Sequence, residues 1–131
     1  MLSYNVTINV DDDIHDDWVD WMTTQHIPDV IATKCFNNYS MHRLLSPEPE
    51  EGTTYVIQYV CDNVEDYERY QIEHAALLQN SHIEKFGGKF TAIRSLMEEV
   101  WSNQQLRIRN YELNMENENS DNSKKSGKEL D

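Results

Sequence analysis

The chain has few of the residues that mark secreted, metal-binding or membrane-embedded proteins. Its 131 residues include two cysteines, three prolines and four glycines, and they contain no apolar run long enough for a membrane span. Cys35 and Cys61 lack CxxC spacing, so we expect two reduced thiols that pack as small hydrophobic side chains. Because the sequence also shows no signal peptide, we expect a cytoplasmic protein that does not associate with membranes.

Basic residues are also scarce. The chain has 11 Lys and Arg against 24 Asp and Glu, a formal net charge of −13. Residues 1–101 hold 18 of the acidic and 6 of the basic residues, so the negative charge belongs to this part. A field of this sign repels phosphate backbones, and we therefore expect no nucleic-acid partner. The acidic residues either form a solvated surface or attract a cationic or protein partner.

Motifs that would name a reaction are absent from the sequence. It contains no HExxH, no CxxC and no cluster of His and Cys, so we expect no metal and no cofactor. His74 and His82 are about 12 Å apart along one predicted helix and do not share a metal. Gly87-Gly88 is typical of a helix end rather than a phosphate loop, and no serine has a nucleophile-elbow context.

What the sequence does contain is an alternation of strand and helix patterns. It is sharpest in residues 53–70, where a strand pattern changes to a helix pattern at the capping residues Asp62 and Asn63. The patterns predict strands at 2–10, 38–45, 53–61 and 89–98, and helices at 11–25, with a kink at His26-Ile27-Pro28, and at 64–86.

This order of elements predicts an α+β, ferredoxin-like βαββαβ fold. Its antiparallel sheet has the strand order 4-1-3-2, and both helices cover one face. We expect residues 1–101 to form this domain and residues 102–113 to form a short terminal element. Residues 114–131 are poor in apolar side chains, so we expect a disordered polar tail.

Four separated segments resemble a known family. They are YNVTINV, WVDWMTTQHIPDVIAT, TTYVIQYVCDN and HIEKFGGKFTAIRSL. Over residues 1–101 the chain resembles an uncharacterised bacterial family, domain of unknown function 4286. The resemblance implies a ferredoxin-like fold akin to the dimeric α/β-barrel group, which includes monooxygenases, haem-degrading enzymes, isomerases and ligand-sensing modules. These relatives are usually dimers with a pocket between sheet and helices, but the resemblance implies no particular reaction.

Aromatic and histidine side chains are the best candidates for a ligand site between the helices and the sheet. A small-molecule pocket needs apolar walls with a few polar groups. The candidate ligand-binding residues are Trp18, Trp21, His26, Tyr55, Tyr59 and His74. The alternative is that these aromatic side chains only pack the core and that His26 bonds to carbonyl groups at the helix kink.

The fold leaves one sheet face uncovered, and a second copy of the chain is its simplest cover. We therefore expect a homodimer. The candidate dimer-face residues are Val56, Gln58, Val60, Arg43 and Arg94. Arg43, Arg94 and Gln58 together have the chemistry to hold a carboxylate, while the alternative is that the arginines pair with acidic residues of the domain or of the partner subunit.

Together these features predict a small acidic homodimer that binds a small-molecule ligand or a protein partner without catalysis. The alternative is a cofactor-independent enzyme, similar to a monooxygenase or an isomerase, with an aromatic pocket between helices and sheet. In that enzyme His26 or His74 would act as the acid or base.

Overall fold

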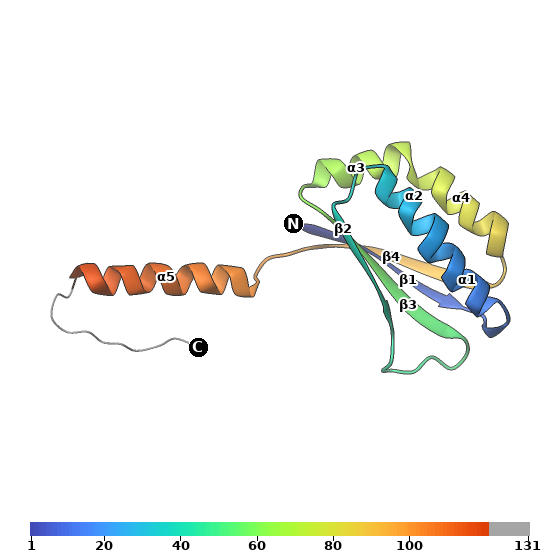
Figure 1. Cartoon of the computed structure of the whole chain (residues 1–131), viewed down its shortest axis with the longest axis horizontal. Helices are drawn as coiled ribbons and strands as arrows, with labels where there is room; N and C mark the ends of the chain where they lie inside the picture. Colours follow the sequence, from blue (N-terminus) through green and yellow to red (C-terminus); the bar gives the residue numbers. More distant parts are fainter. Residues whose placement is uncertain (121–131) are drawn as a thin grey trace. The chain divides into compact units, whose positions relative to one another are not determined.

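The computed structural model describes residues 1–120 (Figure 1). It divides into one unit comprising Met1–Glu98 and a second that begins at Glu99.

The first unit is built on a four-stranded antiparallel sheet. Its strands are β1 (Leu2–Val10), β2 (Asn38–Arg43), β3 (Thr53–Cys61) and β4 (Phe90–Glu98). They lie in the order β2-β3-β1-β4, with Tyr4 opposite Tyr59 and Val6 opposite Ile57 in the central pair. The predicted ferredoxin-like strand order is confirmed, and β3 has the predicted bounds. β2 ends earlier than the predicted Leu45.

Helices cover one face of this sheet (Figure 1). Along the chain they are a 3₁₀ turn (Asp12–Ile14), α1 (His15–Trp21), a π-helical turn (Met22–His26), α2 (Ile27–Ala32), α3 (Val64–Glu73) and α4 (Ala75–Phe86). Strand alternation in β1 sends every second side chain toward them, and Tyr4, Ile8 and Val10 are fully buried there. Trp18 and Met22 pack on the same face and complete the core.

The kink predicted at His26-Ile27-Pro28 takes the form of the π-helical turn. Pro28 has no amide hydrogen to donate to the preceding helical turn, so the regular hydrogen-bond pattern is interrupted. The Thr23 and Thr24 hydroxyls donate to the carbonyls of Val19 and Asp20 at 2.9 and 2.7 Å. The wider turn places His26 on the side of the helix layer that faces the sheet. π-helical turns often occur at functional sites.

The helix predicted over residues 64–86 is instead two helices that meet at His74. Asn63 caps α3 by accepting a hydrogen bond from the Asp66 amide at 2.9 Å. Tyr70 and Ala75 are both buried, yet five residues on a continuous helix are about 140° apart around the axis. The break at His74 brings both to the sheet. It also turns His82 and Phe86 inward and leaves Leu77 exposed.

The described part of the second unit contains one helix, α5 (Asn103–Ser120). It is longer than the short element predicted at 102–113, and it includes residues 114–120, for which the composition predicted disorder. Low hydrophobicity shows that a segment lacks a buried face, but Glu and Met are still good helix formers. The rest of the predicted tail, residues 121–131, lies outside the described residues. No helix within residues 1–120 combines the length and the apolar character needed to cross a membrane.

Candidate functional site

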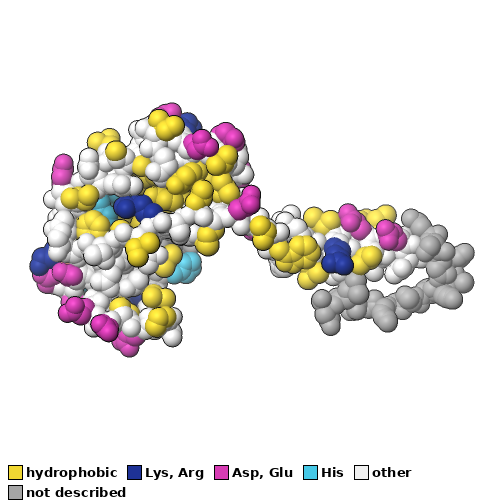
Figure 2. Space-filling view, turned by 180° about the vertical axis from the view of Figure 1, so that it is seen from behind, with side chains coloured by type: hydrophobic (Ala, Val, Ile, Leu, Met, Phe, Trp, Pro, Cys, Tyr) yellow, Lys and Arg dark blue, Asp and Glu magenta, His cyan; other side chains and the backbone are white. Residues whose placement is uncertain are grey.

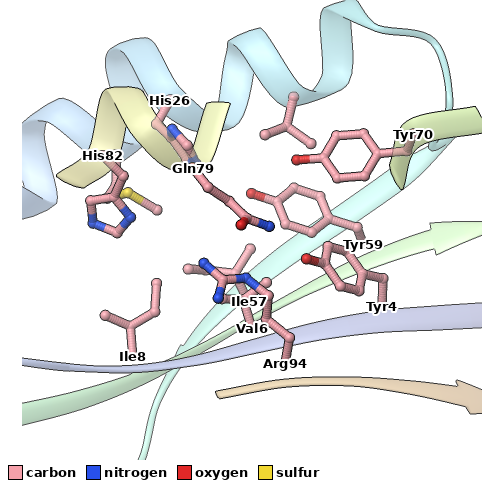
Figure 3. A pocket seen from close by; sticks show the side chains of 12 residues that line it. Tyr4, Val6, Ile8, His26, Ile57, Tyr59, Tyr70, Gln79, His82 and Arg94 are labelled. Atoms are coloured by element: carbon pink, nitrogen blue, oxygen red, sulfur yellow. The ribbon is translucent and has the colours of Figure 1, made fainter. Parts of the chain in front are cut away.

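A small cavity lies between the helix layer and the sheet of the first unit (Figure 3). Its volume of about 20 Å³ is room for a single water molecule. The lining residues are Tyr4, Val6, Ile8, Met22, His26, Val30, Ile57, Tyr59, Tyr70, Gln79, His82 and Arg94. They combine an apolar floor from β1 and β3 with polar side chains from six different elements.

Tyrosines form one wall of the cavity. Tyr4 on β1, Tyr59 on β3 and Tyr70 on α3 pack around Phe36, whose ring centroid lies 5.3 Å from Tyr59 and 5.0 Å from Tyr70. The hydroxyl groups of Tyr59 and Tyr70 point toward the middle of the cavity, where the Gln79 amide also lies (Figure 3). Burial raises the pKa of both tyrosines, so both hydroxyls stay protonated and can donate hydrogen bonds.

Histidines form the opposite wall. The Trp18 indole nitrogen Nε1 donates to His82 Nε2 at 2.9 Å, which places the proton of the neutral ring on Nδ1. The His82 ring also stacks on Phe90 at 3.8 Å between centroids, and the His26 ring lies 5.3 Å away. Burial, with a smaller contribution from the Arg94 charge, lowers the pKa of His82 to about 3 and that of His26 to about 4. Both rings are therefore neutral at neutral pH.

Gln79 and Arg94 border the more exposed side of the cavity. Arg94 pairs with Val6 in the sheet register, so its side chain lies on the helix-covered face. It is solvent-exposed, while Gln79 on α4 is half-buried. Figure 2 shows basic side chains beside hydrophobic and histidine side chains on one face of the domain. Arg94 is in none of the ion pairs formed within residues 1–120, and it is the only charged residue among those that line the cavity.

The cavity thus offers protonated hydroxyls, neutral imidazoles, one amide and one guanidinium above an apolar floor. This arrangement suits an uncharged or singly negative small molecule. No three His, Cys, Asp or Glu side chains gather into a metal-binding group in the part of the chain that the structure describes.

Two of the six residues predicted to bind a ligand, His26 and Tyr59, line the cavity. Trp18 lies behind it and holds His82, while the Trp21 ring stacks on His26 at 5.0 Å. Tyr55 bonds through its hydroxyl to His15 Nε2 at 2.6 Å and does not line the cavity. His74, at the α3–α4 break, is not among the lining residues either.

Sequence reasoning missed Tyr4, Tyr70, Gln79, His82 and Arg94 as members of this site. The signal for Arg94 was present, because alternation along β4 places it on the same face as Phe90 and Ala92. His82 was not recoverable in this way. A continuous helix would align His74 and Ser81 with Tyr70, and only the break at His74 turns His82 inward.

The five residues predicted for the dimer face do not share one face, which corrects that prediction. Val56, Gln58 and Val60 lie on the face without helices, because Ile57 and Tyr59 between them face the helices. Arg43 is paired with Tyr55 and Arg94 with Val6, so both arginines lie on the helix side. Arg43, Arg94 and Gln58 therefore cannot hold one carboxylate together.

Comparison with known proteins agrees with the fold. A family model described as a domain of unknown function (DUF4286) matches residues 1–100. No curated protein matches the chain in sequence.

Among solved structures, one similar protein is an ethyl tert-butyl ether D (EthD) family protein from Bacillus halodurans C-125. It is 12% identical, the match covers 76% of this chain and 100% of that one, and the TM-score is 0.55. An EthD-like protein from Ralstonia eutropha JMP134 is 14% identical, with 76% and 94% covered and a TM-score of 0.52. A dimeric ferredoxin-like protein from an uncultured marine organism is 13% identical, with 77% and 95% covered and a TM-score of 0.51. At these identities the similarity shows the ferredoxin-like fold alone.

Proposed function

The chain belongs to the family described as a domain of unknown function (DUF4286), and we propose that it is a homodimeric module that binds a small molecule between its helices and its sheet, without catalysis. The observation that carries this proposal is the convergence of Tyr59, Tyr70, His26, His82 and Arg94 on one cavity. Tyr59 and Tyr70 are buried, and polar groups inside a domain are costly unless they have hydrogen-bond partners. A bound ligand with polar groups supplies such partners.

Ligand entry requires the cavity to widen, because about 20 Å³ holds only a water molecule. Gln79 is the side chain best placed to move. It is half-buried, its amide lies in the cavity, and it comes from the outer helix layer rather than from the packed sheet. Rotation of Gln79 toward solvent opens the cavity without moving the backbone.

The uncovered sheet face supports the homodimer. Besides Val56 and Val60 on β3, it carries Ile93 and Met97 of β4, which are 73% and 51% exposed in the single chain. These apolar side chains alternate with polar ones such as Gln58, and a two-fold copy covers such a face with the same residues from both subunits. One structurally similar protein is itself dimeric.

A thermal-shift screen tests the binding proposal. The parent chain and two matched variants, Tyr59→Phe in the cavity and Tyr39→Phe on β2, are heated with a panel of small metabolites. Tyr39 is half exposed and does not line the cavity. We expect at least one compound to raise Tm of the parent and of Tyr39→Phe, and to raise it less in Tyr59→Phe. A panel with no hit, or a shift that Tyr59→Phe leaves unchanged, contradicts the proposal.

The second candidate function is the cofactor-independent enzyme, which His26 favours. This ring lies in the cavity and is neutral, so it can accept a proton from a bound molecule. A pKa of about 4 makes it a weak base at neutral pH, which is why binding without catalysis ranks first. Incubating each thermal-shift hit with the protein and following it by mass spectrometry separates the two functions. Turnover that His26→Asn abolishes, with binding retained, establishes the enzyme; an unchanged compound supports the binding module.

A further inference from the structure

We infer that the ligand of this cavity is a small monocarboxylate whose carboxylate lies on Arg94 and whose apolar body lies over Val6, Ile8 and Ile57. This inference rests on the proposed function, because it names the chemical class of the molecule that the cavity binds. It is carried by the isolation of one guanidinium among neutral polar groups at the cavity.

Arg94 is the only charged residue that lines the cavity. Its domain is acidic, because residues 1–101 contain 18 Asp and Glu but only 6 Lys and Arg. Arg69 pairs with Asp66 at 3.5 Å and Lys89 pairs with Asp13 at 2.7 Å. Arg94 has no such pair within residues 1–120, and no Asp or Glu lines the cavity beside it. A guanidinium binds a carboxylate through two parallel hydrogen bonds, which fits a ligand that brings the missing anion.

The other polar groups of the cavity are uncharged, so the ligand that Arg94 balances carries a single negative charge. His26 and His82 are neutral, because burial lowers the pKa of each far below 7. The Tyr59 and Tyr70 hydroxyls stay protonated, since burial raises the pKa of both. A single positive charge balances a carboxylate, whereas a phosphate dianion needs further cations that the cavity lacks. The hydroxyls remain as donors for the second carboxylate oxygen or for a further carbonyl.

The apolar floor of the cavity determines the chemistry of the rest of the ligand. Val6, Ile8 and Ile57 lie below Gln79 and the histidines, and they offer only hydrocarbon surface (Figure 3). Burying an apolar body there removes hydrocarbon surface from water, which stabilises the complex. The ligand therefore carries its polar groups at one end.

The test compares acids with amides of the same shape. Acetate, propionate and benzoate are titrated against acetamide, propionamide and benzamide at pH 7, with inorganic phosphate as a separate probe. Binding to the whole 131-residue chain is followed by chemical shifts in nitrogen-15 NMR spectra. The variants are Arg94→Met and the matched control Arg43→Met, which removes an exposed arginine from the same sheet side but away from the cavity. Gln79→Ala is added to widen the cavity.

We expect the acids to bind at least tenfold more tightly than their amides. Arg94→Met should weaken acid binding at least tenfold, while Arg43→Met changes it less than twofold and Gln79→Ala favours benzoate over acetate. If acids and amides bind equally, if phosphate binds in preference, or if Arg94→Met has no effect, the carboxylate assignment is overturned while the binding function stands. If none of the probes binds to the parent or to Gln79→Ala, the carboxylate assignment is overturned, and the metabolite screen decides separately whether the binding function stands.

Discussion

His82 shows how one residue couples the core to the cavity. Its ring accepts a hydrogen bond from Trp18, stacks on Phe90 and faces the cavity, and only 3% of the residue is exposed. A charged imidazolium at this position would lose its hydration, and its Nε2 could no longer accept the proton of Trp18. Folding therefore favours the neutral ring.

This predicts a loss of stability in acid. The pKa of His82 falls from 6.5 to about 3 on folding, so below pH 6.5 the unfolded chain takes up a proton that the folded chain does not. The contribution of neutral His82 to the free energy of unfolding is complete above pH 6.5 and decreases as the pH falls toward 3. Between pH 7 and 5 the loss from this residue is about 2 kcal/mol.

Urea unfolding of the parent and of His82→Gln at pH 7, 6 and 5 measures this effect. Glutamine keeps an acceptor for Trp18 but does not titrate, so the variant should lose about 2 kcal/mol less over this range. Equal losses in the two proteins would show that His82 is protonated in the folded state as easily as in the unfolded chain.

Side-chain roles were predictable from the sequence only where the local pattern survives in the fold. His26 and Tyr59 were identified as candidates because the kink at Pro28 and the alternation in β3 both persist. Arg94 had been assigned to the wrong sheet face, although its register with Phe90 and Ala92 was readable. His82 escaped because the break at His74 has neither proline nor glycine to announce it.

Among the connecting elements, the loop between β2 and β3 depends on Gly52. This residue has a φ of +70°, and a Cβ added there would overlap the carbonyl oxygen of Val10 and lie 2.9 Å from Asn9 Oδ1. Asn9 also holds the loop by donating to the Glu51 carbonyl and to Thr54 Oγ1, both at 3.0 Å. The loop thus packs tightly against the end of β1.

Gly52→Ala is therefore expected to destabilise the domain by about 2–4 kcal/mol, from backbone strain plus the overlap with Val10. Gly88→Ala is the matched control, because Gly88 has a φ of +86° but open space around its Cβ position. It should cost about 1 kcal/mol from strain alone. Equal losses in urea unfolding would mean that the loop moves away from Val10 freely.

Across the whole first unit, the ferredoxin-like topology follows from features that the sequence displays openly. Alternation in residues 2–10 and 53–61 and the order of the elements were enough to predict the strand order and the helix-covered face. The cavity was not predictable in detail, because its lining comes from seven elements whose mutual packing is set by the break at His74 and the π-helical turn. The same topology leaves the other sheet face without helices.

The homodimer is tested with matched charge insertions. Val60→Lys places a charge at the uncovered face, and Ile72→Lys places one on α3, where the native side chain is 82% exposed. We expect the parent and Ile72→Lys to sediment as dimers at micromolar concentration and Val60→Lys to sediment as a monomer, because a buried unpaired charge is costly. If the parent sediments as a monomer, or if Val60→Lys sediments as a dimer like the parent, the assignment of this face is refuted.

The most direct test of the central proposal uses two glutamine side chains as reporters. The Gln79 amide lies in the cavity and the Gln58 amide lies on the opposite, uncovered sheet face. Nitrogen-15 NMR spectra are recorded while a thermal-shift hit is titrated into the protein. Binding between helices and sheet predicts that the Gln79 amide signals shift in a saturable way while those of Gln58 stay in place. A shift of the Gln58 signals alone, or of neither pair of amide signals, would contradict a ligand site in this cavity.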